Sequence, residues 1–553
     1  MRTKAKPLTF LPFAMALLTG YGWSLAYPSQ DIHGIAWCIP ALLAFLWGWG
    51  KEHGKRGVVL TASVTHALAT LNWLGNMPHA GGALAGWLAL SAYCALYPAL
   101  WAWVFLHWGI MRWKASSASS NLPLLDFLRS VTWIQGQIMA LLGACLWVAL
   151  EWIVSWLFTG FPWLLLGSTQ RGWLPLAQTA SLGGVTMISW IMVWLSLSTA
   201  LGLCRLKLRS HRPWAWIPDT VLPLGCLILL HFHGFWRIQH IMALRPEPML
   251  QVASIQPAFP QDLIWEPNEG KRMMAVMKDL TRAALKTDPD LVLWPESAYP
   301  GGESLEGILS MTQTQDAWLC FNGTDISQEG SKGHPDYYNA AFLIAPDGHL
   351  AGSYHKRHLV MFGEYIPWVE QLPWLKRLSP VQSQYRAGKE PARLRLTNPT
   401  LDLYPLICFE DVLPSLARAA SEGPPALMVN LTNDGWFGTG KAQQQHANLA
   451  AFRCIETGLA MVRSGNNGLS CWIDPMGRLQ GLPPSGTGSI HARGFQTFQI
   501  PIGWQAPTLY ARFGYLFAPL CLIASCLGLI RFRFKSSQKA SWQKHPNQGL
   551  FFF

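Results

Sequence analysis

Long apolar stretches dominate the first half of the chain and return once near its end. Eight of them approach the length needed to cross roughly 30 Å of hydrocarbon, because a helix rises about 1.5 Å per residue and a bilayer requires every backbone group to be paired internally. They cover residues 8–26, 35–50, 57–77, 83–110, 134–158, 178–204, 216–236 and 510–530, of which the second is short. This pattern predicts a membrane bundle of about eight transmembrane helices.

More polar sequence with shorter periodic runs fills the chain between residues 246 and 505. Patterns of buried strands alternate there with helical patterns, which is typical of an α/β fold. The expected strands are Met249–Ile255, Leu291–Trp294, Ala340–Ala345, Leu403–Cys408 and Ala426–Asn430, and the expected helices are Lys271–Lys286 and His446–Gly458. We therefore expect seven membrane helices over 1–245, a soluble α/β domain over 246–505, and an eighth helix with a basic tail over 506–553.

Basic residues lie in short clusters between the apolar stretches, and their distribution predicts an orientation. With a cytoplasmic amino terminus every cluster faces the cytoplasm, whereas the opposite loops near 27–34 and 78–82 contain no Lys or Arg and the next contains only Arg171. Basic residues near helix ends resist translocation, so we expect cytoplasmic termini and an α/β domain on the periplasmic side of an inner membrane. The clusters are Arg2, Lys4 and Lys6; Lys51, Lys55 and Arg56; Arg112, Lys114 and Arg129; Arg205, Lys207, Arg209 and Arg212; and Arg531, Arg533, Lys535, Lys539 and Lys544.

Composition agrees with a membrane protein and excludes one other class. Half of the 553 residues are apolar, 13% are charged and 30 are Trp, a balance that suits contact with lipid. The net charge of +12 would suit a nucleic-acid-binding protein only if the basic residues formed one soluble face, and they flank apolar stretches instead. We expect membrane lipid, and no nucleic acid, among the partners.

Two features of the apolar stretches allow a second interpretation. The first stretch begins like a cleaved signal peptide, although its length and the lack of a small-residue cleavage site favour a retained helix. Glu151 lies near the outer end of the fifth stretch, where an exposed carboxylate is costly, so it should face protein or water. Its role is either a hydrogen bond between helices or the lining of a lipid path.

Three segments of the α/β domain place reactive side chains where a predicted strand meets a loop. Leu291–Glu296 ends in Trp-Pro-Glu, Tyr354–Glu364 contains Lys356, and Leu406–Glu410 contains Cys408. Rigid strand ends of α/β sheets commonly carry functional sites. Taken singly, the glutamate of the first segment reads as a turn carboxylate, the lysine as a solvated charge and the cysteine as an inert buried thiol.

Together, these residues supply the parts of a cysteine-nucleophile site. Such a nucleophile needs a base for its proton and donors that stabilise the charge on the attacked carbonyl. Glu296 can deprotonate Cys408, while the Lys356 ammonium and the Phe409 backbone N–H can hold the oxyanion. The combination therefore predicts nucleophilic acyl chemistry.

The same segments resemble the nitrilase superfamily, whose Glu-Lys-Cys triad lies on an αββα sandwich. Asn433-Asp-Gly-Trp-Phe-Gly438 and Arg463-Ser-Gly-Asn-Asn-Gly468 extend the resemblance over nearly the whole domain. With its membrane helices, the chain resembles the membrane-embedded branch formed by the apolipoprotein N-acyltransferase family. That resemblance rests on Phe158-Thr-Gly-Phe-Pro-Trp163, on Gln256-Pro with Trp265 downstream, and on Thr508-Leu-Tyr-Ala-Arg-Phe-Gly514.

The resemblance implies several supporting residues around the triad. Glu364 and Glu410 match glutamates on which the family relies, although an ion pair that orients Lys356 or a loop explains Glu410 equally well. The resemblance further implies substrate or lid roles for Trp265, Phe362 and Trp436; packing in a core is the simpler interpretation of Trp265. Two departures from the family pattern, Met361 in place of Pro and Phe409 in place of Tyr, leave the triad intact.

The implied reaction moves a fatty acyl chain from a phospholipid, through a Cys408 thioester, to the α-amine of the diacylglyceryl-cysteine of a bacterial apolipoprotein. We expect a monomeric enzyme without a cofactor or metal, since the chain has neither paired His at helical spacing nor a Cys-x₂-Cys ligand set. The eleven cysteines show no disulfide pattern. The alternatives are a membrane-anchored nitrilase or amidase that cleaves C–N bonds, and a lipid-binding scaffold without catalysis.

Overall fold

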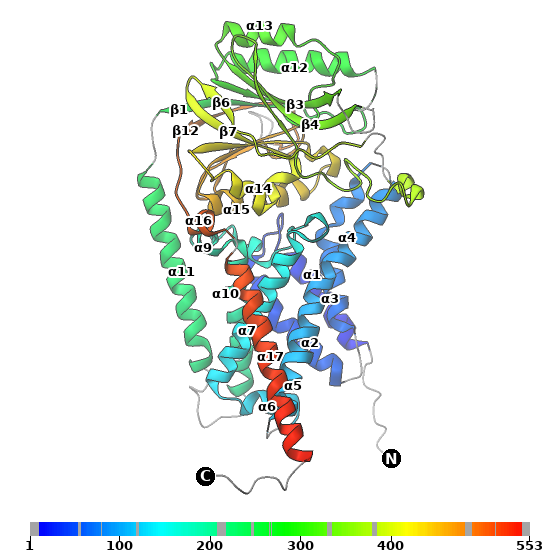
Figure 1. The fold of residues 1–553 in the computed structure, drawn as a ribbon, viewed down its shortest axis with the longest axis vertical. Coiled ribbons are helices and arrows are strands. Elements are labelled where there is room, and N and C mark those ends of the chain that lie inside the picture. The colour runs from blue at the N-terminus through cyan, green and yellow to red at the C-terminus, as the bar shows by residue number, and fades with distance from the viewer. Residues whose placement is uncertain are drawn as a thin grey trace. The chain divides into compact units, whose positions relative to one another are not determined.

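The computed structural model forms two compact units, which Figure 1 shows as a ribbon. The first, here called the helical unit, comprises Met1–Thr70, Leu90–Gly234 and Tyr515–Phe553, and the second, the α/β unit, comprises Leu71–Ala89 and Phe235–Gly514. The structure describes residues 10–52, 57–78, 80–117, 121–206, 217–244, 248–264, 266, 268–328, 335–378, 384–481, 489–514 and 516–544.

Most helices that match the predicted apolar stretches lie in the helical unit, and the first turns of Ala80–Ala115 and the last turns of Ile217–Ala243 belong to the α/β unit. In the described residues, five helices are long and apolar enough to cross a membrane, namely His33–Lys51, Ala80–Ala115, Trp133–Val154, Val185–Leu206 and Ile217–Ala243; Val58–Thr70 and Phe517–Arg531 are shorter apolar helices. A helical region with several candidate spans is thus confirmed, and the number eight stays a prediction. The principal helices are α1 (Leu11–Ser24), α2 (Ile39–Glu52), α3 (Val58–Thr70), α4 (Ala80–Trp101) with a π-helical continuation (Ala102–Met111), α7 (Trp133–Val154), α10 (Val185–Leu206), α11 (Ile217–Ala243) and α17 (Phe517–Lys544).

Several helix ends differ from the sequence expectation, and local backbone explains each difference. Helix α7 begins after a capping box at Thr132 and ends at Val154, because Trp156, two residues further on, has a non-helical φ of −139°. Helix α10 begins at Val185, after a glycine with φ of 78°, and not at residue 178. A glycine with φ of 60° likewise separates α16 (Leu509–Phe513) from α17 inside the expected eighth stretch.

Polar side chains inside the helical unit form hydrogen bonds with other side chains and with the backbone, as an apolar environment requires. Gln137 on α7 accepts a hydrogen bond from Trp194 Nε1 on α10 at 2.9 Å and donates to the Asp219 carbonyl on α11 at 2.6 Å. Glu151 accepts hydrogen bonds from Trp147 Nε1 at 3.0 Å and from the backbone N–H of Leu166 at 2.7 Å. These contacts fasten the loop after α7 to the helix, and Glu151 also lines a pocket with Trp23 and His66, so both roles considered for it stay predictions.

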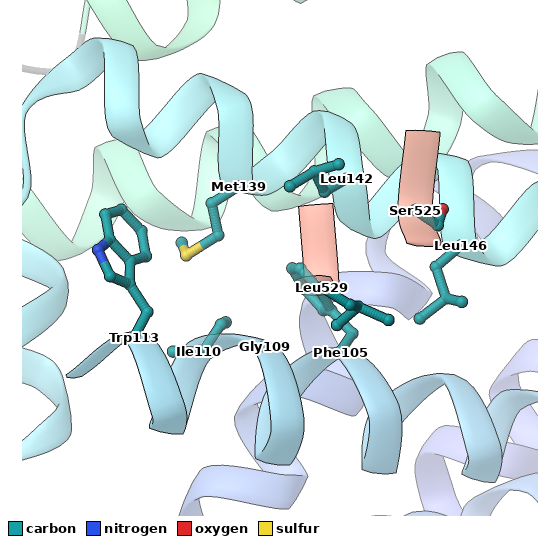
Figure 2. Close-up of a pocket in the computed structure, with 9 residues that line it drawn as sticks. All are labelled: Phe105, Gly109, Ile110, Trp113, Met139, Leu142, Leu146, Ser525 and Leu529. Carbon is teal, nitrogen blue, oxygen red and sulfur yellow. The ribbon is translucent and has the colours of Figure 1, made fainter. Parts of the chain in front are cut away.

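An apolar pocket lies between the π-helical segment, α7 and α17 (Figure 2). Aromatic and aliphatic side chains line most of it, and Ser525 is its polar member. The lining is Phe105, Gly109, Ile110, Trp113, Met139, Leu142, Leu146, Ser525 and Leu529. Its hydrocarbon character is consistent with the lipid environment predicted for these helices.

The α/β unit contains, in its described residues, two six-stranded sheets. The strand order is β12-β1-β2-β3-β4-β5 in one sheet and β11-β10-β9-β8-β7-β6 in the other. The strands are β1 (Met249–Gln256), β2 (Leu291–Leu293), β3 (Trp318–Ser327), β4 (Asp336–Ile344), β5 (Leu350–His355), β6 (Leu394–Thr397), β7 (Thr400–Ile407), β8 (Ala426–Thr432), β9 (Met461–Gly465), β10 (Cys471–Ile473), β11 (Leu479–Gln480) and β12 (Gly494–Pro501). The α/β prediction is therefore confirmed.

Alternating burial along the strands builds the αββα layers. Leu291 and Leu293 of β2 face the other sheet in a shared core with Leu403 and Val429, while Val292 of β2 faces the helices. The helices α12 (Gly270–Leu285) and α13 (Glu306–Thr314) cover one sheet, and α14 (Pro414–Ala419) and α15 (Ala442–Thr457) cover the other (Figure 1). A rigid sandwich of this kind holds the loops at its strand ends in fixed positions.

The observed ends of the predicted elements differ from the expected ones by up to four residues, and local structure explains three of these differences. Strand β4 begins at Asp336, four residues before the expected start, because pairing with β3 continues to that residue. Strand β7 ends at Ile407 instead of Cys408, because Cys408 has a φ of 52° that an extended strand does not allow. Helix α15 begins at Ala442, one turn before the expected His446, and ends before Gly458, whose φ is 72°.

Candidate active site

The predicted triad residues follow the ends of three strands. Glu296 lies three residues after β2, Lys356 directly follows β5, and Cys408 directly follows β7 and begins a 3₁₀ turn, η8 (Cys408–Val412). Glu296 is 7% exposed and Lys356 is 1% exposed. A buried lysine must have anionic partners, because an isolated buried charge is very costly.

Lys356 lies between two carboxylates. Its Nζ is 2.9 Å from Glu364 Oε2 and 3.5 Å from Glu296 Oε1. Burial alone would lower the pKa of Lys356, but Glu364 and Glu296 outweigh it and hold the pKa well above its ordinary value. The side chain is therefore a permanent ammonium and can stabilise negative charge but cannot act as a base.

A pair of asparagines that the sequence reasoning missed supports both carboxylates. Asn339 Nδ2 on β4 donates to Glu296 Oε1 at 3.0 Å and to Glu364 Oε1 at 2.7 Å. Asn322 Nδ2 on β3 donates to Asn339 Oδ1 at 2.6 Å, and its own oxygen accepts from the backbone N–H of Ser297 at 3.2 Å. No sequence signal singled them out, because each lies where its strand changes between apolar and more polar residues.

The second oxygen of Glu296 is also engaged. Glu296 Oε2 accepts a hydrogen bond from the backbone N–H of Asn433 at 3.1 Å. Asn433 caps a short turn, η9 (Asp434–Phe437), by accepting from the Gly435 backbone N–H at 3.1 Å. The carboxylate thus has a fixed orientation relative to the loop that follows β8.

Cys408 has the conformation and setting of a functional residue more than of a core residue. It is half-buried, whereas Cys320, Cys454 and Cys471 of the same unit are fully buried. Its φ of 52° places a non-glycine residue in the left-handed region, a strain that is often found at functional sites. Its thiol interacts electrostatically with Glu296 and Lys356, so the structure brings the three predicted residues together.

The thiol of Cys408 is protonated at rest. Burial raises its pKa first and the neighbouring Glu296 carboxylate raises it further, while Lys356 and a hydrogen bond with Thr432 act in the opposite direction without overcoming them. This answers a question the sequence left open, because Lys356 alone does not produce a resting thiolate. Attack by Cys408 consequently requires a base within reach, and Glu296 is the carboxylate in that position.

Glu410 joins the nucleophile turn to the lysine loop. Its Oε1 accepts from the backbone N–H groups of Arg357 at 2.8 Å and His358 at 3.0 Å, and its Oε2 accepts from that of Ile407 at 2.8 Å. The hydroxyl of Tyr354 also donates to it at 2.9 Å. The contacts agree with the loop-orienting interpretation of Glu410, since they hold the two residues after Lys356 and the residue before Cys408 through their backbone N–H groups.

The remaining predicted residues lie on separate loops around the triad. Phe409 follows Cys408, and its ring stacks on His358 with centroids 6.0 Å apart. Phe362 has a φ of 61° and is 37% exposed, while Trp436 is half-buried in η9. Met361 pairs with Tyr365 in the loop that carries Glu364. Trp265 lies outside the described residues.

The arrangement is suited to acyl transfer. A thiol beside a carboxylate can lose its proton as it attacks a carbonyl, and a permanent ammonium beside the same thiol can stabilise the oxyanion that forms. Glu364 pairs with the Lys356 ammonium at 2.9 Å, and Asn339 donates to the Glu296 carboxylate at 3.0 Å, so both groups have fixed positions. The arrangement therefore fits the predicted roles of nucleophile, base and electrostatic stabiliser.

Comparison with known proteins identifies relatives of both parts of the chain. The carbon-nitrogen hydrolase family model matches residues 251–492, and the model of the apolipoprotein N-acyltransferase N-terminal domain matches residues 19–198. Proteins named apolipoprotein N-acyltransferase are similar over most of their length. The protein from Azotobacter vinelandii is 34% identical over 84% of this chain and 85% of its own; that from Pseudomonas syringae pv. tomato is 34% identical over 74% and 76%; and that from Geobacter metallireducens is 29% identical over 95% and 96%.

Proposed function

The chain belongs to the apolipoprotein N-acyltransferase family, and from this premise we propose that Cys408 carries the transferred acyl group as a thioester. Glu296 is the general base and acid, and Lys356 with the Phe409 backbone N–H stabilises the oxyanion. Glu364, Glu410 and the asparagine pair hold these groups in place. The observation that carries the proposal is the strained, half-buried Cys408 thiol beside a carboxylate and a buried ammonium.

The first half-reaction loads the enzyme. The Cys408 sulfur attacks the ester carbonyl of a phospholipid while Glu296 accepts the thiol proton. The ester C–O bond then breaks, and Glu296 returns the proton to the departing lysophospholipid oxygen. A thioester and a lysophospholipid remain.

The second half-reaction discharges the thioester to an amine. The α-amine of a diacylglyceryl-cysteine at the amino terminus of an apolipoprotein attacks the thioester carbonyl and passes a proton to Glu296. The C–S bond breaks, and the same proton restores the Cys408 thiol. The product is an amide, and the enzyme returns to its starting state without a cofactor.

A membrane location follows from the chemistry of the donor. An acyl chain of about sixteen carbons gains roughly 0.8 kcal/mol for each CH₂ kept from water, so extracting the chain costs on the order of 12 kcal/mol. We propose that about eight helices anchor the enzyme in the inner membrane, with residues 246–505 as a catalytic domain on the periplasmic side and both termini in the cytoplasm. The chain then remains in an apolar environment while its carbonyl reaches Cys408, and one copy of the enzyme suffices.

Complementation tests this function directly. A bacterial strain depleted of its own N-acyltransferase receives the wild-type chain, Cys408→Ala, or Cys320→Ala as a matched control for loss of a buried thiol. Burial raises the pKa of Cys320 to about 12, so its thiol is inert. We expect growth and triacylated lipoprotein with the wild type and the control only. Rescue by Cys408→Ala would refute the proposal, and a hydrolase would rescue in no form.

A further inference from the structure

Four buried charged side chains form a closed ring behind the Cys408 turn. His446 Nε2 is 2.7 Å from Asp411 Oδ1, and His446 Nδ1 is 2.8 Å from Asp434 Oδ1. Arg463 closes the ring through Nη1 to Asp411 Oδ2 and through Nη2, 3.5 Å from Asp434 Oδ2. All four residues are at most 2% exposed. We call Asp411, Asp434, His446 and Arg463 the charge ring.

The charge ring alternates in sign. Both ring nitrogens of His446 face carboxylate oxygens, so both donate, which is the hydrogen-bonding pattern of an imidazolium. Two cations then alternate with two anions, and each carboxylate contacts both cations. Such a set is balanced in charge, whereas removal of one member leaves a buried charge without compensation.

The ring connects four structural elements around the nucleophile. Asp411 belongs to η8, the same turn as Cys408, and Asp434 belongs to η9, whose capping residue holds Glu296. His446 lies on α15 and Arg463 on β9. The ring therefore fastens the turn that carries the nucleophile to the turn that orients its base.

A short hydrogen-bonded path leads from the ring to the sulfur. Thr432 Oγ1 donates to Asp434 Oδ1 at 3.3 Å and is also hydrogen bonded to the Cys408 thiol, so its single proton stabilises the sulfur anion only when Asp434 does not hold it. Asn430 Nδ2 also donates to the Cys408 carbonyl at 2.9 Å. The orientation of the thiol thus depends on where Asp434 holds the threonine hydroxyl.

We propose that the charge ring is a set of positioning residues that fixes the Cys408 thiol through Thr432 and the η8 turn. This inference rests on the proposed role of Cys408 as nucleophile and extends it to residues that contact neither substrate. A purely structural ring would affect stability alone. A positioning ring must also change the pH at which the Cys408 thiol reacts, and this quantity can be measured independently of stability.

The pH profile of Cys408 alkylation provides that readout. The groups that act on the thiol are Glu296, Lys356, Asp434 and the Thr432 hydroxyl; after burial, the two carboxylates raise its pKa, whereas the lysine and the threonine lower it. In the full-length enzyme in detergent, iodoacetamide labelling of Cys408 should therefore shift to lower pH in Asp434→Asn and to higher pH in Thr432→Val. Asp474→Asn, a fully buried carboxylate in the turn after β10, is the matched control and should keep the wild-type profile. Profiles of both ring-path variants that coincide with the control would overturn the inference.

A charge-balance cycle tests whether the ring acts as a unit. His446→Gln leaves two carboxylates with one cation, and we expect about tenfold slower acylation of Cys408 by phospholipid, within the range known for misplaced reacting groups. Adding Asp434→Asn restores the balance, so the double variant should recover at least about threefold over His446→Gln. A double variant as slow as, or slower than, His446→Gln would overturn the inference. The proposed function would fail separately, by transfer activity in Cys408→Ala.

Discussion

Replacing Asn339 by Leu tests the support beneath the triad. The substitution keeps the side-chain size but removes the donor that bridges Glu296 and Glu364 at 3.0 and 2.7 Å. A hydrogen bond to a charged group is worth about 1.5–3 kcal/mol, and a tenfold rate change corresponds to about 1.4 kcal/mol. If the free energy of the lost hydrogen bond to Glu296 is added in full to the activation barrier for acylation, acylation of Cys408 should slow by about 10- to 150-fold.

The assay is single-turnover acylation of the purified enzyme in phospholipid micelles, followed by the mass of the Cys408 peptide. Thr312→Val is the control, because it removes another buried hydrogen-bonding side-chain group from the same unit, on α13, where the Thr312 hydroxyl bonds only the Leu309 carbonyl among its described contacts. Thermal unfolding of both variants separates loss of stability from loss of rate. Wild-type acylation by Asn339→Leu would refute the view that this asparagine orients the triad.

Three further predictions follow from the same contacts. Glu410→Gln places an amide donor among backbone donors and should lower the free energy of unfolding by about 1–3 kcal/mol, measured by denaturant titration against the exposed control Glu422→Gln. Glu296→Gln removes a carboxylate that raises the Cys408 pKa, so alkylation at neutral pH should become faster while acyl transfer is lost; slower alkylation would contradict this. Burial and Lys356 lower the pKa of His358 to about 4, below its unfolded value of about 6.5. Neutral His358 therefore makes its full contribution to the free energy of unfolding above pH 6.5, and this contribution is lost as the pH falls toward 4. His358→Gln should flatten this acid loss of stability, and the exposed His349→Gln should not.

The features of the protein that depend on local sequence pattern were predictable from the sequence. The apolar periods predicted the helical region, and the strand-and-loop motifs predicted the α/β domain, because burial and residue spacing fix these features locally. Membership of the acyltransferase family, expected from motifs such as Phe158–Trp163, is confirmed by the relatives. The reactive residues stood at strand ends in the sequence, and the sandwich brings Glu296, Lys356 and Cys408 together.

What the sequence did not reveal depends on contacts between distant segments. Asn322 and Asn339 are ordinary strand residues until the pairing of β3 with β4 places Asn322 against Asn339, which in turn donates to Glu296. His446 was expected only as the first residue of a helix, and its position between Asp411 and Asp434 depends on how α15 packs on its sheet. The resting protonation of Cys408 likewise depends on burial, which no motif encodes.

The most direct measurement of the central claim is the mass of the Cys408 peptide before and after exposure to substrates. After incubation of the enzyme with a dipalmitoyl phospholipid, we expect a palmitoyl adduct on Cys408 that disappears when a diacylated lipopeptide is added and reappears as an amide on that peptide. Cys408→Ala should show neither event. Transfer to the lipopeptide without an adduct on Cys408, or an adduct that the lipopeptide does not discharge, would contradict the account.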